Sequence, residues 1–364
     1  MKIEEIIAIM EQWAPPVYAE DFDNVGLLVG AAASNCSGVL ITHDVNETVV
    51  EEAIEKKCNF IVCFHPILFK GLKRITGQDY VQKTILKAIQ NNIAIYALHT
   101  ALDNHPQGVS YHLGQCLGLT HQKTLVPQKN SLYHLTTYVP EKNKEAVLEA
   151  LHQAGAGQLG HYSQCSFSNP GEGRFKGNIQ SQPALGEKEA LTSVNEVLIR
   201  VLVPKHAQSK IISALHQTHP YETVAYELVA LANTNPSIGM GSIGQLPTPM
   251  DTAAFIKHVK QAVNIPTLRH SKCSKQKIER VAVLGGSGSF CIDAARKQGA
   301  DALVTADLKY HDFFKAEKDL LLIDAGHYET EHFTKKIIHQ HLTKKIANFA
   351  VTLSTVNTNP VIYS

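Results

Sequence analysis

The sequence has no apolar run that approaches the ~18 residues of a membrane-spanning helix. It has no excess of either charge, and a formal net charge of +1 argues against a general electrostatic grip on nucleic acid or anionic lipid. Its seven cysteines are scattered and odd in number, so no disulfide framework is expected. Residues 1–10 lack the basic start and long apolar core of a signal peptide. We therefore expect a cytoplasmic protein, with neither a membrane nor nucleic acid as a partner.

The composition is that of an ordinary globular protein. Hydrophobic residues make up 44% of the chain and charged residues 18%, a balance that argues against extended disorder. A chain of 364 residues is long enough for two or three domains.

Strand and helix patterns alternate in the two outer parts of the chain. Short continuous apolar runs predict buried strands, and apolar positions three and four apart predict helices. The predicted strands are 38–42, 59–64, 93–98, 279–284, 302–305 and 349–356, and the predicted helices are 2–14, 46–57, 80–92, 289–298 and 328–345. Repeated strand–helix–strand order indicates an α/β fold with a parallel or mixed sheet. Residues 38–66 and 280–311 share one plan, as an internal duplication would produce.

The middle of the chain has a different order. It reads as strand 132–140, helix 143–154, a Gly- and Ser-rich run 155–177, strand 194–203, helix 206–217 and strand 224–231. This order is typical of a ferredoxin-like unit. We expect an inserted domain at 126–233, with 1–125 and 234–364 forming one discontinuous α/β domain around it. The Gly-rich run is either a flexible binding loop or a long hairpin of an oligomer-forming domain.

Polar side chains with metal-ligand chemistry follow several of the predicted strands. His65 comes directly after strand 59–64, and His99 and Asp103 come after strand 93–98. In α/β sheets, ligands bind beyond the carboxyl ends of the strands. His43 and Asp44 follow strand 38–42 in the same way, where they could orient a ligand.

The segment Gly326–Glu331 follows the apolar run 320–323. If a helix begins near Tyr328, His327 and Glu331 lie four positions apart on one face. An imidazole and a carboxylate placed in this way suit a borderline divalent metal. The segment Gly285–Gly288 also lies between a strand and a helix, and is either an anion cradle at a helix N-terminus or a tight turn that lets the backbone approach the pocket.

Together these pieces resemble the GTP cyclohydrolase I type 2 family, also called NIF-three-like. The matching segments are Asp23-Asn24-Val25-Gly26-Leu27, His65-Pro66-Ile67-Leu68-Phe69-Lys70-Gly71-Leu72, His99-Thr100-Ala101-Leu102-Asp103, Gly285-Gly286-Ser287-Gly288, Asp307-Leu308-Lys309-Tyr310-His311-Asp312 and Gly326-His327-Tyr328-Glu329-Thr330-Glu331. They occur in family order and span nearly the whole outer chain. The insert resembles the family's optional middle domain, which is similar to PII and CutA proteins; its matching segments are Gly155-Ala156-Gly157, Tyr162-Ser163, Cys165-Ser166-Phe167, Gly171-Glu172-Gly173 and His219-Pro220-Tyr221-Glu222.

The resemblance implies a two-metal centre on a mixed α/β fold, in a ring-shaped homohexamer. Carried over to this chain, His65 and Asp103 bind one metal, His327 binds the other, and Glu331 bridges both. The cofactor is one or two divalent ions, with zinc, manganese, iron and cobalt not distinguished by these ligands.

One residue departs from the family pattern, which has two adjacent histidines where this chain has Phe64 and His65. Because phenylalanine has no lone pair to donate, the second metal loses a ligand, and it is weak, absent, or completed by water or another residue. His99 and His311 are candidate substitutes, and spacing does not decide between them. Lys309 either pairs with a substrate phosphate or is solvated, and His311 either moves a proton or orients a ligand.

Two functions follow. The first is a hydrolase acting on a nucleotide or similar small molecule, nominally GTP with release of formate, through metal-activated water. The second is a non-enzymatic hexameric regulator or scaffold that binds metal and senses a ligand through the PII-like insert; the loss of a histidine at Phe64 favours it modestly. A ring that threads and cuts DNA is disfavoured by the near-neutral charge.

Overall fold

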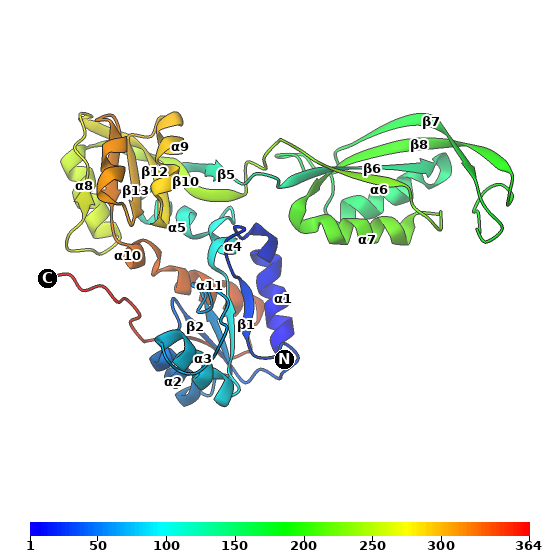
Figure 1. The fold of residues 1–364 in the computed structure, drawn as a ribbon. Helices are drawn as coiled ribbons and strands as arrows, with labels where there is room; N and C mark the ends of the chain where they lie inside the picture. Colours follow the sequence, from blue (N-terminus) through cyan, green and yellow to red (C-terminus); the bar gives the residue numbers. More distant parts are fainter. The chain divides into compact units, whose positions relative to one another are not determined.

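The computed structural model describes residues 1–364, which form two compact units. One unit consists of Met1–Pro127 together with Pro236–Ser364, and the other is the continuous segment Gln128–Asn235 inserted between them. The outer unit is a mixed α/β structure with two sheets, and the inserted unit has a sheet of its own (Figure 1). No helix is both long and apolar enough to cross a membrane.

The first sheet of the outer unit has the strand order β1-β4-β3-β2-β15. Its strands are β1 (Gly26–Val29), β2 (Val39–Thr42), β3 (Phe60–Cys63), β4 (Ala94–Ala97) and β15 (Val351–Leu353). All neighbours are parallel except β1, which runs antiparallel to β4. Helices α1 (Ile3–Trp13) and α11 (Thr334–Lys345) share a core with one face, and α2 (Glu47–Glu55) and α3 (Tyr80–Gln90) with the other (Figure 1). Because both faces are covered, the strands are continuous apolar runs.

The second sheet of the outer unit has the order β11-β14-β13-β12-β10-β5. Its strands are β5 (Thr120–Pro127), β10 (Gly239–Asp251), β11 (Arg269–His270), β12 (Lys277–Ser287), β13 (Ala302–Ala306) and β14 (Leu321–Asp324). β12, β13 and β14 are parallel, whereas β10 and β5 add antiparallel strands beyond β12. Helices α5 (Val109–Cys116) and α8 (Thr252–Ala262) pack on one face, and α9 (Ile292–Lys297) packs on the other. Each sheet therefore contains a strand–helix–strand unit with parallel neighbours.

The inserted unit is a four-stranded antiparallel sheet with two helices. Its elements are β6 (Leu132–Pro140), α6 (Lys144–Gln153), β7 (Ser166–Lys176), β8 (Leu191–Pro204), α7 (Gln208–Thr218) and β9 (Tyr226–Ala230). The strands lie in the order β7-β8-β6-β9, and both helices share one core with the sheet. The element order in the chain is βαββαβ.

Several elements differ from the sequence-based expectation. Of the two alternatives for the Gly-rich run 155–177, the structure shows the hairpin: the run contains strand β7, which pairs antiparallel with β8 over its whole length. Its side chains are mostly exposed, so the strand lacks the alternating apolar pattern that would reveal it. The expected helix 328–345 is two helices, α10 (His327–Glu331) and α11, with a break at residues 332 and 333. Strands β5 and β10 and helix α8 are additional to the elements that the sequence patterns predict.

Glu52 of α2 binds the chain segment that follows β15, and so holds this segment against helix α2. This buried carboxylate accepts hydrogen bonds from Lys56 Nζ at 2.7 Å and from the backbone and hydroxyl of Thr355 at 2.8 and 2.7 Å, and it also accepts one from the Ser354 hydroxyl. Burial by itself would raise the pKa of Glu52, but these donors outweigh it and lower the pKa to about 2. The ionised carboxylate is therefore favoured in the folded state.

We expect Glu52→Gln to lower the free energy of unfolding by about 2 kcal/mol at pH 7. Because the folded pKa lies below the unfolded value of 4.5, this contribution is present above pH 4.5 and disappears as the pH falls toward 2. Urea unfolding of both proteins at pH 7, 5 and 3 measures the difference. Glu51→Gln, at an exposed position of the same helix, is the control and is expected to change stability by less than ~1 kcal/mol. A wild-type advantage that stays constant from pH 7 to pH 3 would contradict the prediction.

Candidate metal centre

The candidate site lies where several parallel strands of the outer unit end. His43 follows β2, His65 lies two residues after β3, and His327 and Glu331 are the first and last residues of α10, which follows β14. β2 and β3 belong to the first sheet and β14 to the second, so residues that follow the carboxyl ends of strands in both sheets form the site.

The structure brings His65, His327 and Glu331 into a tight cluster. Glu331 Oε2 lies 3.3 Å from His65 Nε2 and 3.2 Å from His327 Nε2, and the two Nε2 atoms are 3.4 Å apart. Three ligand atoms held about 2.0–2.1 Å from a tetrahedral ion are about 3.3–3.4 Å from one another. Glu331 is 3% exposed, and its Oε2 has no hydrogen-bond partner. The cluster thus has the chemistry and the spacing that a divalent metal needs.

Each of the two histidines is held by a carboxylate on its other ring nitrogen. His65 Nδ1 lies 2.7 Å from Asp44 Oδ1, and His327 Nδ1 lies 2.7 Å from Asp307 Oδ2. A carboxylate behind a histidine fixes the ring orientation and the tautomer, and makes the free nitrogen a better ligand. Both Nε2 atoms are therefore directed to Glu331.

The charges of the cluster support one another. Burial alone would raise the pKa of Glu331, but His327 and His65 outweigh it and hold the pKa well below the usual range. Burial alone would lower the pKa of both histidines, but the neighbouring carboxylates outweigh it. Asp44 and Glu331 raise the pKa of His65 to about 9. Asp307 and Glu331 raise the pKa of His327 to about 11. These interactions favour the ionised carboxylate and the protonated rings, and a divalent cation can replace the protons on the ring nitrogens.

The Gly285–Gly288 segment packs against the Glu331 side chain and hydrogen-bonds to Asp307. An ideal Cβ on Gly286, whose φ is +67°, would lie 2.2 Å from Glu331 Oε1, so only glycine lets the backbone approach the carboxylate. The hydroxyl of Ser287 donates to Asp307 Oδ2, the oxygen that holds His327. Of the two readings of this segment, the geometry supports the close backbone approach.

Asp103 and Phe64 lie at the margin of the cluster. Asp103 ends α4 (His99–Asp103), and its buried Oδ1 has no hydrogen-bond partner. Burial and the negative charge of Glu331 raise the pKa of Asp103 well above its usual range, so its carboxyl lies in the field of the same cluster. Phe64 is fully buried and offers no donor atom.

The structure places the other candidate residues in different surroundings. His99 Nδ1 lies 2.7 Å from Asp23 Oδ1, so the Asp23 turn packs against α4. Lys309 is exposed, and so is His311, whose ring contacts Tyr310 and Phe314. Neither of these two residues lines the pocket that adjoins the histidines.

His43 lies beside the cluster, a position that the tertiary structure shows and the sequence pattern only hinted at. It is 2% exposed, and its Nε2 lies 3.6 Å from Glu331 Oε2. Burial and the neighbouring His65 lower the pKa of His43 to about 4, so the ring is neutral at pH 7. The only sequence signal was the position of His43-Asp44 after a predicted strand.

A pocket of about 590 Å³ adjoins the histidines and is large enough for a small-molecule substrate. His43, His65 and His327 line it, together with Arg269, Tyr328 and, from the C-terminal segment, residues 359–361 and Tyr363. Arg269 donates to Asp324 and to the backbone oxygen of Leu308, and thus already has partners in this state.

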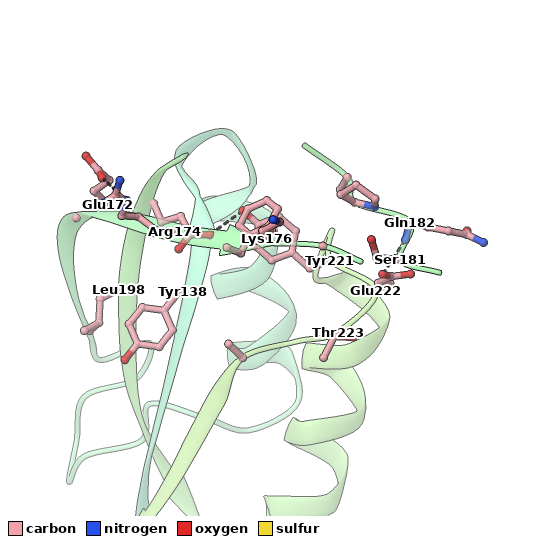
Figure 2. A pocket seen from close by; sticks show the side chains of 18 of the residues that line it. Tyr138, Glu172, Arg174, Lys176, Ser181, Gln182, Leu198, Tyr221, Glu222 and Thr223 are labelled. Atoms are coloured by element: carbon pink, nitrogen blue, oxygen red, sulfur yellow. Dashed lines mark hydrogen bonds and ion pairs between the residues drawn. The ribbon is translucent and has the colours of Figure 1, made fainter. Parts of the chain in front are cut away.

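The inserted unit has a second pocket, of about 850 Å³, over one end of its sheet (Figure 2). Arg174 and Lys176 of β7 and the turn after α7 line it, with the loop residues Ser181 and Gln182 beside that turn (Figure 2). Tyr221 donates to Glu196 Oε1 at 2.7 Å, and the backbone of Gln182 donates to Glu222 at 2.9 Å.

Comparison with known proteins identifies the family. The sequence model of the Duf34/NIF3 (NGG1p interacting factor 3) family matches residues 1–360. A protein of Halalkalibacterium halodurans named GTP cyclohydrolase 1 type 2 homolog is 37% identical over 366 residues, which cover 99% of this chain and 98% of that protein. A Bacillus subtilis protein of the same name is 34% identical over 369 residues, which cover 99% of this chain and 98% of that protein.

Solved structures agree with these relatives. A Bacillus cereus protein related to NIF3 has a TM-score of 0.85 at 36% identity, covering 100% of this chain and 99% of that one. A Staphylococcus aureus protein has a TM-score of 0.75 at 31% identity, covering 100% and 99%. The resemblance drawn from the motifs is confirmed: the chain belongs to the Duf34/NIF3 family.

Proposed function

We propose that this protein is a metal-dependent hydrolase that acts on a nucleotide, nominally GTP with release of formate. The observation that carries the proposal is the triangle of His65 Nε2, His327 Nε2 and Glu331 Oε2, with sides of 3.2–3.4 Å. The names of the full-length relatives supply the nominal reaction, and the adjoining pocket provides room for a small-molecule substrate.

The residues of the site fit a metal centre and define their own roles. A divalent ion in such a site supplies Lewis acidity and makes water acidic near neutral pH. His65 and His327 present neutral Nε2 donors once their protons leave, because Asp44 and Asp307 keep hold of the Nδ1 protons. Glu331 supplies the negative charge, and Asp103, whose pKa is raised by burial and by Glu331, is the candidate for a second carboxylate. The proposed reaction uses two waters: the first adds to a purine ring carbon and breaks one of its C–N bonds to give a formamide, and the second breaks the remaining C–N bond, so that the carbon leaves as formate and the nitrogen is left as an amine.

The test is formate release from GTP by purified protein loaded with zinc, manganese, iron or cobalt in turn. We expect metal-dependent turnover that is lost by at least about 100-fold in His327→Ala and in Glu331→Ala. His216→Ala, at an exposed position of the inserted unit, is the matched control and should keep wild-type activity. Retained turnover in both site variants would rule out this function.

The second candidate function is a non-enzymatic metal-binding regulator, which the pocket in the inserted unit favours (Figure 2). The βαββαβ order of that unit, with strands in the order β7-β8-β6-β9, supports a ferredoxin-like, PII/CutA-like domain. We include in this candidate the homohexameric ring that the family resemblance implies. Full metal content without turnover of any nucleotide would favour the regulator over the hydrolase.

A further inference from the structure

His43 reaches the metal cluster from a strand that carries none of the other ligands. Strands β2 and β3 are parallel neighbours, with Thr42 opposite Cys63, so the next residues of the two strands, His43 and Phe64, lie side by side. The backbone N–H groups of Phe64 and His65 both donate to His43 O at 3.1 Å. The rings of His43 and Phe64 are stacked, with centroids 5.4 Å apart. The backbone pairing thus fixes His43 directly beside the position where β3 offers only a phenyl ring.

The His43 ring has polar atoms that the protein itself does not satisfy. Both Nδ1 and Nε2 are buried without a hydrogen-bond partner. Buried polar groups are rarely left in this state, because burial without a partner is unfavourable and each instance calls for an explanation such as an ion. Around the ring lie His65 and Phe64, with centroids at 4.7 and 5.4 Å, and Tyr328, at 5.3 Å.

Two carboxylates lie near His43: Asp44, which forms a group of potential ligands with His43 and His65, and Glu331 at the centre of the cluster. His43 Nε2 lies 3.6 Å from Glu331 Oε2, which is too long for a hydrogen bond. Two ligand atoms that each lie about 2.1 Å from one ion are about 3.0–3.6 Å apart for angles of about 90–120°. The same Oε2 makes no hydrogen bond of standard geometry, although the Nε2 atoms of His327 and His65 lie 3.2 and 3.3 Å from it. A cation between the two atoms would satisfy both.

We propose that His43 is a metal ligand of this centre, binding through Nε2 an ion that it shares with Glu331. The centre then contains three imidazoles, with His43 in one group of potential ligands with Asp44 and His65, and His327 and Glu331 in the other group with the same His65. Strand β2 thereby supplies the nitrogen that Phe64 cannot supply from β3. This inference rests on the metal centre of the proposed function, but not on turnover.

The experiment compares wild type with His43→Leu, which keeps the volume but removes both nitrogens. Each protein is stripped with a chelator, and its Zn²⁺ affinity is measured by competition with a chromophoric chelator, with ions per chain counted by elemental analysis. We expect His43→Leu to bind Zn²⁺ about 100-fold more weakly or with a lower stoichiometry, a loss at or above the ~10–100-fold cost of removing a group that only orients a ligand. The d–d absorption of the Co²⁺-loaded protein should change as well, which loss of packing alone would not produce.

Two further variants complete the design. His43→Leu combined with Phe64→His moves the imidazole from β2 to the neighbouring position on β3, and should recover most of the lost affinity. His105→Leu, at a part-buried histidine that does not line the pocket, is the control and should bind Zn²⁺ as wild type does. If His43→Leu does not fold, His43→Gln tests the same prediction with a polar side chain.

The outcomes separate this inference from the proposed function. Wild-type affinity, stoichiometry and Co²⁺ spectrum in the folded His43→Leu protein would overturn the assignment of His43. An equal loss in His43→Leu and His105→Leu would overturn it too. Full metal loading of wild type without any turnover would instead contradict the hydrolase function and leave His43 a ligand.

Discussion

The Glu331→Gln protein is expected to bind Zn²⁺ at least about 100-fold more weakly than wild type. Glu331 Oε2 is the atom that faces three imidazole nitrogens, at 3.2 Å from His327, 3.3 Å from His65 and 3.6 Å from His43. Glutamine has the same shape as glutamate but no negative charge. Because Glu331 is buried, its carboxylate charge attracts a bound cation more strongly than an exposed charge would. Zn²⁺ affinity of the stripped protein, measured by chelator competition, gives the result.

Glu329→Gln is the matched control for this substitution. Glu329 is a buried carboxylate of the same helix, but it accepts hydrogen bonds from Asn359 Nδ2 at 2.9 Å and from the Tyr363 hydroxyl at 3.1 Å instead of facing the histidines. We expect the Glu329→Gln protein to keep wild-type Zn²⁺ affinity. Its only expected effect is weaker hydrogen bonding to the C-terminal segment. Equal Zn²⁺ affinities in Glu331→Gln and wild type would show that the cluster is not a metal centre.

Gly286→Ala is expected to weaken metal binding through a residue that binds no metal. The added methyl group would lie 2.2 Å from Glu331 Oε1 and 3.3 Å from His327 Cε1, so the carboxylate has to move away from the histidines. Alanine at a φ of +67° also costs about 1–2 kcal/mol of backbone strain. We expect a 10–100-fold loss of Zn²⁺ affinity, similar to the loss of a group that orients a ligand, and a lower melting temperature.

Gly299→Ala separates the strain from the contact. Gly299 has a φ of +71°, but an ideal Cβ there meets no atom within 4 Å. Its variant should therefore lose a similar amount of stability and keep wild-type Zn²⁺ affinity. Thermal unfolding and chelator competition on both variants test this, and an equal effect on affinity from the two substitutions would disprove a specific contact with Glu331.

Much of the outer unit could be predicted because its strands are buried on both faces. Runs such as Phe60–Cys63 and Ala94–Ala97 are continuously apolar, and helices such as α3 carry a clear apolar stripe. Polar residues directly after such runs are predicted to lie in a ligand site beyond the carboxyl ends of the strands. His65, His327 and Glu331 do lie together, although His65 follows a strand of the first sheet and the other two follow a strand of the second. Strand β7 could not be recognised in this way, because exposed side chains leave no alternating pattern.

The sequence by itself determined the family, the alternation of strands and helices in the outer unit, and the type of donor atoms at the strand ends. These properties are local: they depend on side-chain chemistry and on periods of two and 3.6 residues along the chain.

Only the tertiary structure decided which of these residues meet. His43 is relevant because the register of β2 against β3 places it beside Phe64, and no periodicity along the chain encodes that register. Gly286 is required because its loop passes the carboxylate of Glu331, which belongs to a different element. Contacts of this kind depend on strand order, crossovers and register, which arise when the chain as a whole buries its apolar surface.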